Sequence, residues 1–381
     1  MSSVLADVAG DLLIVRPPVP ATCNKAGANY KSEVTHLDYA PRRAYDEWLA
    51  ICDAIVASGG DALFAYEPGD EPFLGHAALE VDGDGAIRPA GSREVLGNLV
   101  DVDTGRVFTA NGPWVTVVDR ALRAVMPHML PHRRREGAYF HELLGRIADA
   151  AGLSFEPTEN PHRWEGMADI AVAGDKVILT FAVAGHYDRG LAPKSARSSR
   201  EGVTFAADHV GVAPRARVYA ELVYPHFHGD TVHFGVRPPD GGPAVLVHYA
   251  GGLWGDGHDV VARALPGRLV PIGMADAVHN YAGNSRQVNR GVLVNEDVSA
   301  GFVASLERLG LTVHRVALLE LFGKAGGGPA CATLQLPRSL SLPPEAPFRF
   351  SANREAAFAR RGAIPERLHV SPEFFAGKAR G

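Results

Sequence analysis

The sequence predicts one α/β domain built from repeated units of short strands and a helix. Short apolar runs, such as residues 11–15 and 176–183, are separated by clusters of glycine, proline and aspartate, as buried strands usually are. Three longer stretches place apolar residues on one face of a helix, and a strand-like run follows each of them. The chain has 381 residues, 46% of them apolar, which is enough to bury a large core. One α/β domain explains this pattern most simply.

The three predicted helices cover residues 41–58, 136–151 and 298–309. In the first, apolar residues recur three and four positions apart and a Gly-Gly pair follows, which is a common way for a helix to end. The other two repeat this pattern and also end near a glycine.

The composition changes only at Pro337, after which proline and arginine are frequent. We therefore expect a main domain over residues 1–340 and a C-terminal extension over residues 341–381.

The formal net charge is −5 and charges of both signs are interspersed, so the sequence shows no basic segment of the kind that binds nucleic acid. A small-molecule partner is the remaining expectation. The first residues do not combine a basic segment with an apolar one, and no apolar run reaches the length of a membrane-spanning helix. We therefore expect a cytoplasmic protein without a membrane partner.

Three cysteines, Cys23, Cys52 and Cys331, form an odd and sparse set without a Cys-x-x-Cys pair, so neither a disulfide framework nor a cysteine zinc site is predicted. Cys52 lies on the apolar face of the first predicted helix and is expected to be buried, whereas Cys23 in a loop is left open. Cys331 follows a glycine-rich loop and precedes a strand-like run. Because glycines allow close approach and exposed amides lower a thiol pKa, Cys331 is either a reactive thiol or a small buried side chain.

Residues 224–234 carry three histidines and an aspartate in a segment with a strand-like pattern. Alternation along a strand would place His226, His228 and Asp230 on one face, where an imidazole and a carboxylate can enter one site. A metal site is an alternative, but no third ligand with a clear motif accompanies these residues, so no metal is expected. His226 and His233 are expected to be hydrogen-bonded surface residues.

Acidic and amide residues stand just before two other strand-like runs. Glu165 and Asp169 precede one run, and Asn111 precedes the other. Site residues of α/β folds are common at such strand ends. Each segment alone is also an ordinary turn, because Glu-Gly and Asn-Gly pairs favour turns.

Taken in chain order, Asn111, Glu165, the His228-x-Asp230 pair and the Gly-Gly-Gly-x-x-Cys331 loop resemble the guanidino-group-modifying enzymes of the pentein superfamily. That superfamily includes arginine deiminases, arginine dihydrolases, dimethylarginine dimethylaminohydrolases and amidinotransferases. The resemblance extends over most of the chain. It implies a single-domain α/β propeller of repeated ββαβ units with pseudo-fivefold symmetry, a small guanidino substrate and no cofactor or metal, and it is compatible with a homo-oligomer.

One departure from the common motifs points to a branch of the superfamily. Residues 108–111 resemble the Phe-Thr-Arg-Asp motif of many members, but Asn111 replaces the aspartate. Together with Asn29, His228 and the Ala330-Cys331 pair, Asn111 resembles the arginine dihydrolases, which remove both guanidino nitrogens as ammonia.

The resemblance also implies catalytic roles. Cys331 would attack the guanidinium carbon as a thiolate, His228 would protonate the leaving amine and then activate water, and Glu165 would orient His228 or the substrate.

Four further residues are assigned to substrate binding on the same basis. Asp230 would pair with the guanidinium, Asn29 and Asn111 would supply neutral hydrogen bonds, and Asp169 belongs to the same motif as Glu165.

A substrate carboxylate would be held by an arginine in bidentate fashion. Arg197 matches the motif best, and Arg189 or Arg200 could take its place because the segment before Arg197 is long.

The attack of Cys331 would leave an amidino group covalently bound to its sulfur, which is an S-amidino adduct. The molecule that then removes this group from the cysteine distinguishes the candidate activities. Water gives a hydrolase, which is a deiminase, a dihydrolase or a dimethylarginine hydrolase, and an amine gives an amidinotransferase. A third alternative is a non-catalytic binding protein on this scaffold, like the pentein factors that bind ribosomal subunits, but such factors lack the set of Cys331, His228 and Glu165. We expect a hydrolase because of Asn111, and the sequence leaves the guanidino substrate, the oligomeric state and the role of the C-terminal extension open.

Overall fold

The structure is a computed structural model of the chain. It describes residues 4–7, 10–18, 38–65, 79–81, 86–89, 107–129, 136–183, 186, 197–324, 326–364, 366 and 368–370.

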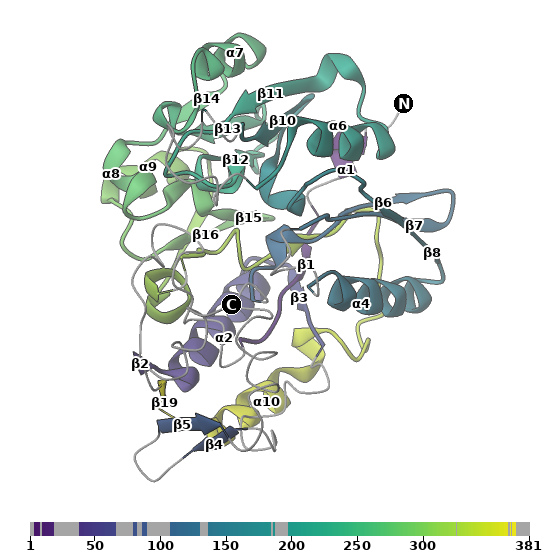
Figure 1. Cartoon of the computed structure of the whole chain (residues 1–381), viewed down its shortest axis with the longest axis vertical. Helices are drawn as coiled ribbons and strands as arrows, with labels where there is room; N and C mark the ends of the chain where they lie inside the picture. Colours follow the sequence, from purple (N-terminus) through teal and green to yellow (C-terminus); the bar gives the residue numbers. More distant parts are fainter. Residues whose placement is uncertain are drawn as a thin grey trace.

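The described residues contain five three-stranded sheets with one common topology (Figure 1). In each sheet the first two strands are antiparallel, a helix follows, and the third strand lies parallel to the second. We name each ββαβ unit by its first strand. The sheets are β6 (Trp114–Val118), β7 (Ala121–Met126) and β8 (Ser154–Glu159); β9 (Ile170–Ala173), β10 (Lys176–Phe181) and β11 (Arg217–Glu221); β12 (His233–Val236), β13 (Val245–His248) and β14 (Leu269–Pro271); β15 (Arg286–Val288), β16 (Gly291–Asn295) and β17 (Thr312–Val316); and β18 (Leu334–Gln335), β1 (Leu12–Ile14) and β3 (Asp61–Leu63).

An α-helix described in the structure lies between the second and third strands of each unit. In the order of these sheets, the helices are α4 (Glu136–Ala151), α6 (Arg200–His209), α7 (Gly257–Ala264), α9 (Ala300–Glu307) and α2 (Pro41–Ala57). The repeated units confirm the predicted α/β class.

The β18 unit combines an early and a late segment of the chain. Its first strand, β18, comes from near residue 335 and pairs antiparallel with β1, with Leu13 opposite Gln335. Its other two strands, β1 and β3, lie at the start of the chain and are parallel. The strand that follows Cys331 is therefore fixed against the first strand of the protein.

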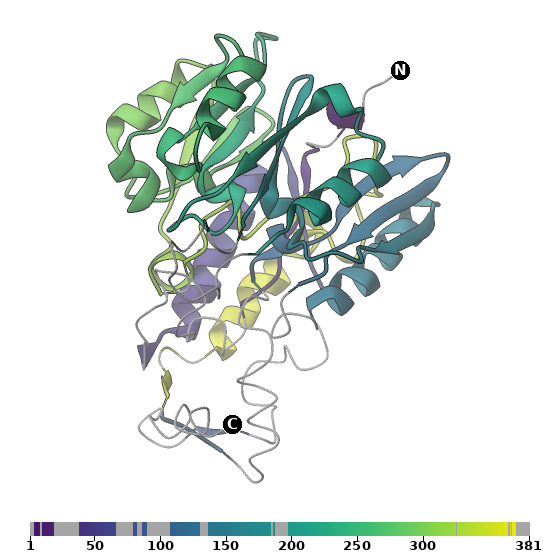
Figure 2. The ribbon, with the colours of Figure 1, turned by 45° about the horizontal axis from the view of Figure 1, so that its top comes forward.

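The residues after β18 pack against this unit. Helix α10 (Phe350–Arg360) lies beside α2 in both ribbon views (Figure 1, Figure 2). Phe350 is fully buried, its ring centroid is 6.1 Å from that of Trp48, and the Tyr45 hydroxyl donates to the Ala357 carbonyl at 3.0 Å. Aromatic contacts of this kind stabilise a buried interface.

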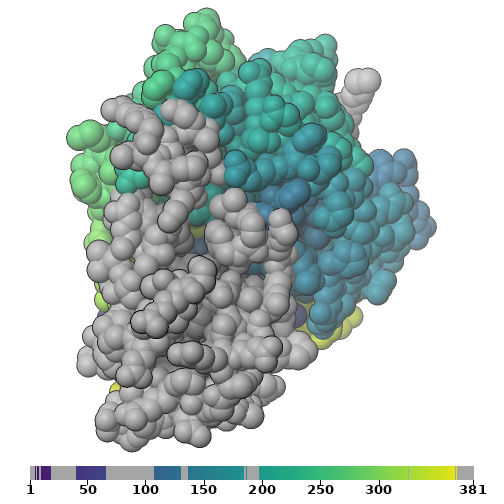
Figure 3. All heavy atoms as spheres, in the orientation of Figure 1, coloured from purple at the N-terminus to yellow at the C-terminus, as the bar shows by residue number. Residues whose placement is uncertain are grey.

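The remaining described elements are short. They include α1 (Val4–Asp7), α8 (Met274–Val278) and a four-stranded sheet of β2 (Asp38–Tyr39), β19 (Leu368–Val370), β5 (Ala86–Pro89) and β4 (Leu79–Val81). On the face shown in Figure 3, the blue and teal atoms of the β6 and β9 units form one continuous surface. Within the described part of the chain, no helix has both the length and the apolar character needed to cross a membrane.

Two of the three predicted helices are confirmed and the third is shorter than predicted. Helices α2 and α4 begin where the apolar periodicity begins, and Cys52 is fully buried in α2, as predicted. Helix α9 begins at Ala300 instead of residue 298, because the Ser299 hydroxyl accepts a hydrogen bond from the Phe302 amide and so caps the helix.

The prediction of a strand over residues 224–234 is wrong for most of that segment. Strand β12 begins only at His233, and the 3₁₀ helix η9 (Gly229–Thr231) precedes it. The Thr231 hydroxyl donates to the His228 carbonyl at 2.7 Å, and the Gly229 amide donates to Asp169 Oδ1 at 2.9 Å. Side chains therefore satisfy the backbone groups that a strand ladder would have used, which favours a turn.

Neighbouring units approach each other closely at their first strands. A Cβ atom on Gly235 in β12 would lie 1.8 Å from the carbonyl oxygen of Val172 in β9. Because no side chain fits in this space, the glycine lets the β9 and β12 units pack together.

We expect Gly235→Ala to lower the free energy of unfolding by about 1–3 kcal/mol, because the added methyl group forces the two units apart. Gly145→Ala is the matched control: Gly145 lies inside α4 and its added Cβ would meet only Phe155 Cδ1 at 3.8 Å. That change should be neutral or stabilise the protein by up to about 1 kcal/mol. Urea unfolding measures both, and equal stability of the two variants would contradict the close approach.

Candidate active site

Each of the five units carries polar residues in the turn just before its first strand. These turns are η4 (Thr109–Asn111) before β6, η6 (Gly166–Asp169) before β9, η9 before β12, η11 (Ala282–Asn284) before β15, and residues 329–333 before β18. All five turns are buried, and hydrogen bonds join them to one another. The repeated topology therefore brings residues that are far apart in the sequence to one place.

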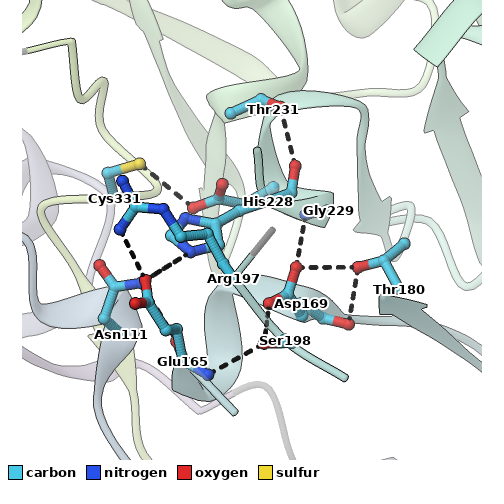
Figure 4. Close-up of polar contacts among 11 residues, drawn as sticks. Asn111, Glu165, Asp169, Thr180, Arg197, Ser198, His228, Gly229, Thr231 and Cys331 are labelled. Carbon is cyan, nitrogen blue, oxygen red and sulfur yellow. Dashed lines mark hydrogen bonds and ion pairs between the residues drawn. The ribbon is translucent and has the colours of Figure 1, made fainter. Parts of the chain in front are cut away.

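His228 and Glu165 meet at the centre of this site (Figure 4). Nε2 of His228 lies 3.0 Å from Oε2 of Glu165, and the two residues are 2% and 0% exposed. The side-chain amide of Asn111 donates to the Glu165 carbonyl at 3.1 Å and lies 3.4 Å from His228 Nε2. A buried carboxylate in this position fixes the orientation of the imidazole ring.

Cys331 lies beside Asp230. The thiol donates to Asp230 Oδ2 at 3.3 Å, and only 4% of Cys331 is exposed. Burial, followed by the negative charge of Asp230, raises the pKa of the Cys331 thiol well above its ordinary value. Burial also raises the pKa of Asp230. The resting site therefore favours a protonated thiol, and a cation next to Asp230 would shift the balance toward the thiolate.

Asp169 ties two of the turns together. Its carboxylate accepts hydrogen bonds from the Ser198 hydroxyl at 2.5 Å, the Gly229 amide at 2.9 Å and the Thr180 hydroxyl at 3.2 Å. Ser198 in turn accepts from the Glu165 amide at 2.9 Å. Through these contacts one carboxylate, whose pKa is raised by burial, fixes the backbone next to both Glu165 and His228. A direct role of Asp169 in substrate binding stays a prediction.

A glycine allows the turns of the β6 and β9 units to touch. Gly166 has a positive φ of 79°, and a Cβ atom on it would lie 2.2 Å from the Gly112 carbonyl oxygen. Any other residue at Gly166 would be strained and would displace Asn111 from Glu165.

Arg197 enters the site from the segment before α6. Its NH1 group donates to Glu165 Oε2 at 3.0 Å, its guanidinium lies 5.8 Å from the ring centre of Phe227, and it is 4% exposed. The structure thus pairs Arg197 with the carboxylate of Glu165, whereas the sequence predicted a role in binding a substrate carboxylate. Arg200 lies elsewhere, with its guanidinium 4.8 Å from the ring centre of Tyr219.

Asn29, Cys23 and Arg189 lie outside the described residues. Their predicted roles stay predictions.

The prediction that His226 and His233 are surface residues is wrong, because each is only 1% exposed. Nδ1 of His226 lies 3.1 Å from the Thr231 hydroxyl, and the ring packs against Tyr249. His233 pairs with His248 across β12 and β13. Burial lowers the pKa of His226 to about 4, so this histidine is neutral near pH 7.

The sequence reasoning missed Asn284. This residue is fully buried, and its Nδ2 donates to Cys331 Sγ at 3.1 Å. The signal was present, because Asn284 stands in a turn just before a strand-like run, as Asn111 does.

No cluster of three or more histidine, cysteine, aspartate or glutamate side chains in the described ranges is arranged to hold a metal ion.

We expect Asp169→Asn to lower the free energy of unfolding by about 1–3 kcal/mol, because an amide cannot accept from all three donors. Asp175→Asn serves as the control, since Asp175 is 70% exposed and pairs with Arg268 at the surface. This control should change stability by less than about 1 kcal/mol. If urea unfolding shows the same small effect for both variants, Asp169 does not fix the two turns.

No protein-family model matches the chain, and no curated protein matches its sequence. Among solved structures it is similar to the N-terminal domain of ArgZ bound to product, an arginine dihydrolase from the ornithine–ammonia cycle in cyanobacteria. The TM-score is 0.60 at 19% identity, over 85% of this chain and 96% of that one.

Two further structures match to a similar extent. A variant of the same ArgZ domain, covalently bound to a reaction intermediate, has a TM-score of 0.60 at 18% identity, over 85% of this chain and 97% of that one. A dimethylarginine dimethylaminohydrolase with an S-methyl-L-thiocitrulline adduct has a TM-score of 0.55 at 17% identity, over 85% and 99%. These likenesses concern the fold, and they confirm the resemblance recognised in the sequence. The chain therefore has the fold of the guanidino-modifying pentein enzymes.

Proposed function

We propose that the protein is a cysteine-dependent hydrolase that acts on the guanidino group of arginine or a substituted arginine. Its intermediate would be a covalent S-amidino adduct on Cys331. The observation that carries this proposal is a buried carboxylate oxygen beside the nucleophile. Asp230 Oδ2 accepts from the thiol, but none of the described residues donates to Asp230 Oδ1. A guanidinium offers both the N–H donors and the positive charge that this oxygen needs.

Glu165 supports the same conclusion, because it already pairs with a guanidinium, that of Arg197. The oxygen that Arg197 contacts is also the one that faces His228. We infer that the substrate guanidinium replaces Arg197 at Glu165. Arg197 would then be released to bind the substrate carboxylate, in agreement with its predicted role.

The positive charge of the substrate and the negative charge of Asp230 together favour the first chemical step, which is the attack of Cys331. A guanidinium carbon is a poor electrophile because its charge is delocalised, so a strong nucleophile is required. The positive charge of the substrate offsets the negative charge of Asp230, which lowers the pKa of Cys331, so the thiol releases its proton to water and becomes the thiolate. Sγ then attacks the guanidinium carbon and forms a C–S bond. A C–N bond breaks as the leaving nitrogen takes a proton from protonated His228.

Water completes the reaction. Neutral His228 removes a proton from a water molecule, which attacks the amidino carbon. The C–S bond breaks and Cys331 leaves as the thiolate. Glu165 holds the imidazole in place in both steps, at 3.0 Å from Nε2. A solved ArgZ domain with a covalently bound reaction intermediate supports a covalent route on this fold.

We also propose that the five units surround a pseudo-fivefold axis as a propeller, with the five polar turns at that axis. Their common topology and the hydrogen bonds between their turns support this arrangement. Residues 1–340 would form the catalytic domain and hold every proposed site residue. Residues 341–381 would be an extension, of which α10 packs on α2.

The test is a product analysis with arginine, with and without glycine as an amine acceptor, for the wild type, Cys331→Ala and Cys52→Ala. We expect citrulline, or ornithine with ammonia, from the wild type. Cys331→Ala should lose at least about 10³-fold in rate, as nucleophile variants do. Cys52→Ala should remain active, because Cys52 is buried in α2 and takes no part in the site.

Amidino transfer that requires glycine would replace the hydrolase by the amidinotransferase. Absence of turnover with arginine and with methylated arginines would contradict an enzymatic role, and an active Cys331→Ala would contradict the nucleophile.

A further inference from the structure

We propose that Asn284 positions the nucleophile: its side-chain amide holds Sγ of Cys331 as a thiolate, aimed at the substrate carbon. This role rests on the proposed function, because it presumes that Cys331 attacks. It concerns a residue that no sequence motif of the site includes.

The hydrogen bonds fix which way the amide points. Asn284 Oδ1 lies 3.0 Å from the backbone nitrogen of Cys331, which can only donate. Nδ2 lies 3.2 Å from the carbonyl oxygen of Asp230, which can only accept. The NH₂ group must therefore be the one that faces Sγ, at 3.1 Å. A donor in this place stabilises a thiolate more than a thiol.

The surroundings prevent the amide from moving. Asn284 is fully buried, and its own carbonyl accepts from the Ala330 amide at 3.0 Å. A Cβ atom on Gly328 would lie 2.9 Å from Asn284 Oδ1, and one on Gly283 would lie 2.6 Å from the Thr231 carbonyl oxygen. The amide is therefore tightly held between the turns that carry Asp230 and Cys331.

Among the described residues, two side chains form hydrogen bonds with Sγ, and they have opposite effects on the stability of the thiolate. The thiol donates a hydrogen bond to Asp230 Oδ2 at 3.3 Å, and the negative charge of Asp230 disfavours the thiolate. The Asn284 amide donates to Sγ, and among the described side chains it is the single hydrogen-bond donor to that atom. When the proton leaves, the contact with Asp230 is lost and the contact with Asn284 becomes charge-assisted. Asn284 thus offers the contact that strengthens in the reactive state.

The repeated architecture gives independent support. The turns before β6, β9, β12 and β18 each place a proposed site residue among the others, namely Asn111, Glu165, His228 and Cys331. The turn before β15 holds the same position in its unit, and Asn284 is its buried polar side chain. Asn284 is therefore the contribution of the fifth unit.

Asn284→Asp tests the role with the smallest change in shape. An aspartate can still accept from the Cys331 amide, but it places an oxygen where the donor to Sγ was. Asn160→Asp is the matched control. Asn160 is 2% exposed, accepts from the His162 amide at 3.0 Å and donates to the Gly202 carbonyl at 2.9 Å, with no cysteine in contact.

The readout is the rate at which iodoacetamide alkylates Cys331 in the full-length protein as a function of pH. Mass spectrometry of the peptide that contains Cys331 separates it from the other cysteines. We expect the apparent pKa of Cys331 to rise by about one to two units in Asn284→Asp, since a hydrogen bond to a charged group is lost. It should stay at the wild-type value in Asn160→Asp.

An unchanged alkylation profile in Asn284→Asp would overturn the proposal, and so would an equal shift in Asn160→Asp. If Asn284→Asp does not fold, Asn284→Ala takes its place, and a rise of about one unit is expected there, because the donor is lost without the added negative charge of an aspartate. The role in catalysis predicts in addition that kcat falls while KM changes little. Alkylation needs no turnover, so an inactive wild type would contradict the proposed function and leave the test of Asn284 intact.

Discussion

The polar groups of this site are buried, so they need hydrogen-bond partners within the protein. The arrangement of the five units supplies those partners. A buried donor or acceptor costs free energy when it is unpaired, and here the partners that pair such groups belong to different units of the chain. Asp169 joins the turn of the β9 unit to that of the β12 unit, and Asn284 joins the turn of the β15 unit to Asp230 and Cys331. The five short sheets with their shared topology serve to bring these turns together, and glycines at the contacts let the backbones approach.

The charges divide the site into two pairs. In one, Glu165 is balanced by Arg197 and faces His228. In the other, Asp230 faces a thiol whose pKa is raised by burial and by Asp230 itself. Both carboxylates suit a guanidinium, and the second also raises the pKa of the Cys331 thiol. In the proposed mechanism a cationic substrate would therefore activate Cys331, while the resting protein keeps the thiol protonated.

Much of the fold class and part of the site could be predicted from the sequence. Helices α2 and α4 follow directly from their apolar periodicity, and the glycine loop before Cys331 singles that residue out as a candidate nucleophile. The segment around His228 was misjudged as a strand, because alternation does not reveal that Asp169 and Thr231 satisfy its backbone. Asn284 carries the same local signal as Asn111, a turn before a strand-like run, but that signal does not reveal its contacts with residues 54 and 47 positions away. Such long-range pairings cannot be identified from a single sequence.

The central claim, a covalent amidino adduct on Cys331, is tested most directly with His228→Gly and S-methyl-L-thiocitrulline. The thiolate leaving group of this compound needs no proton donor, whereas hydrolysis of the adduct needs a base, so the adduct should accumulate when His228 is absent. Peptide mass spectrometry is predicted to find the adduct on Cys331 and to find none in a variant that also carries Cys331→Ser. A folded His228→Gly protein that gains no mass at Cys331 would contradict the account.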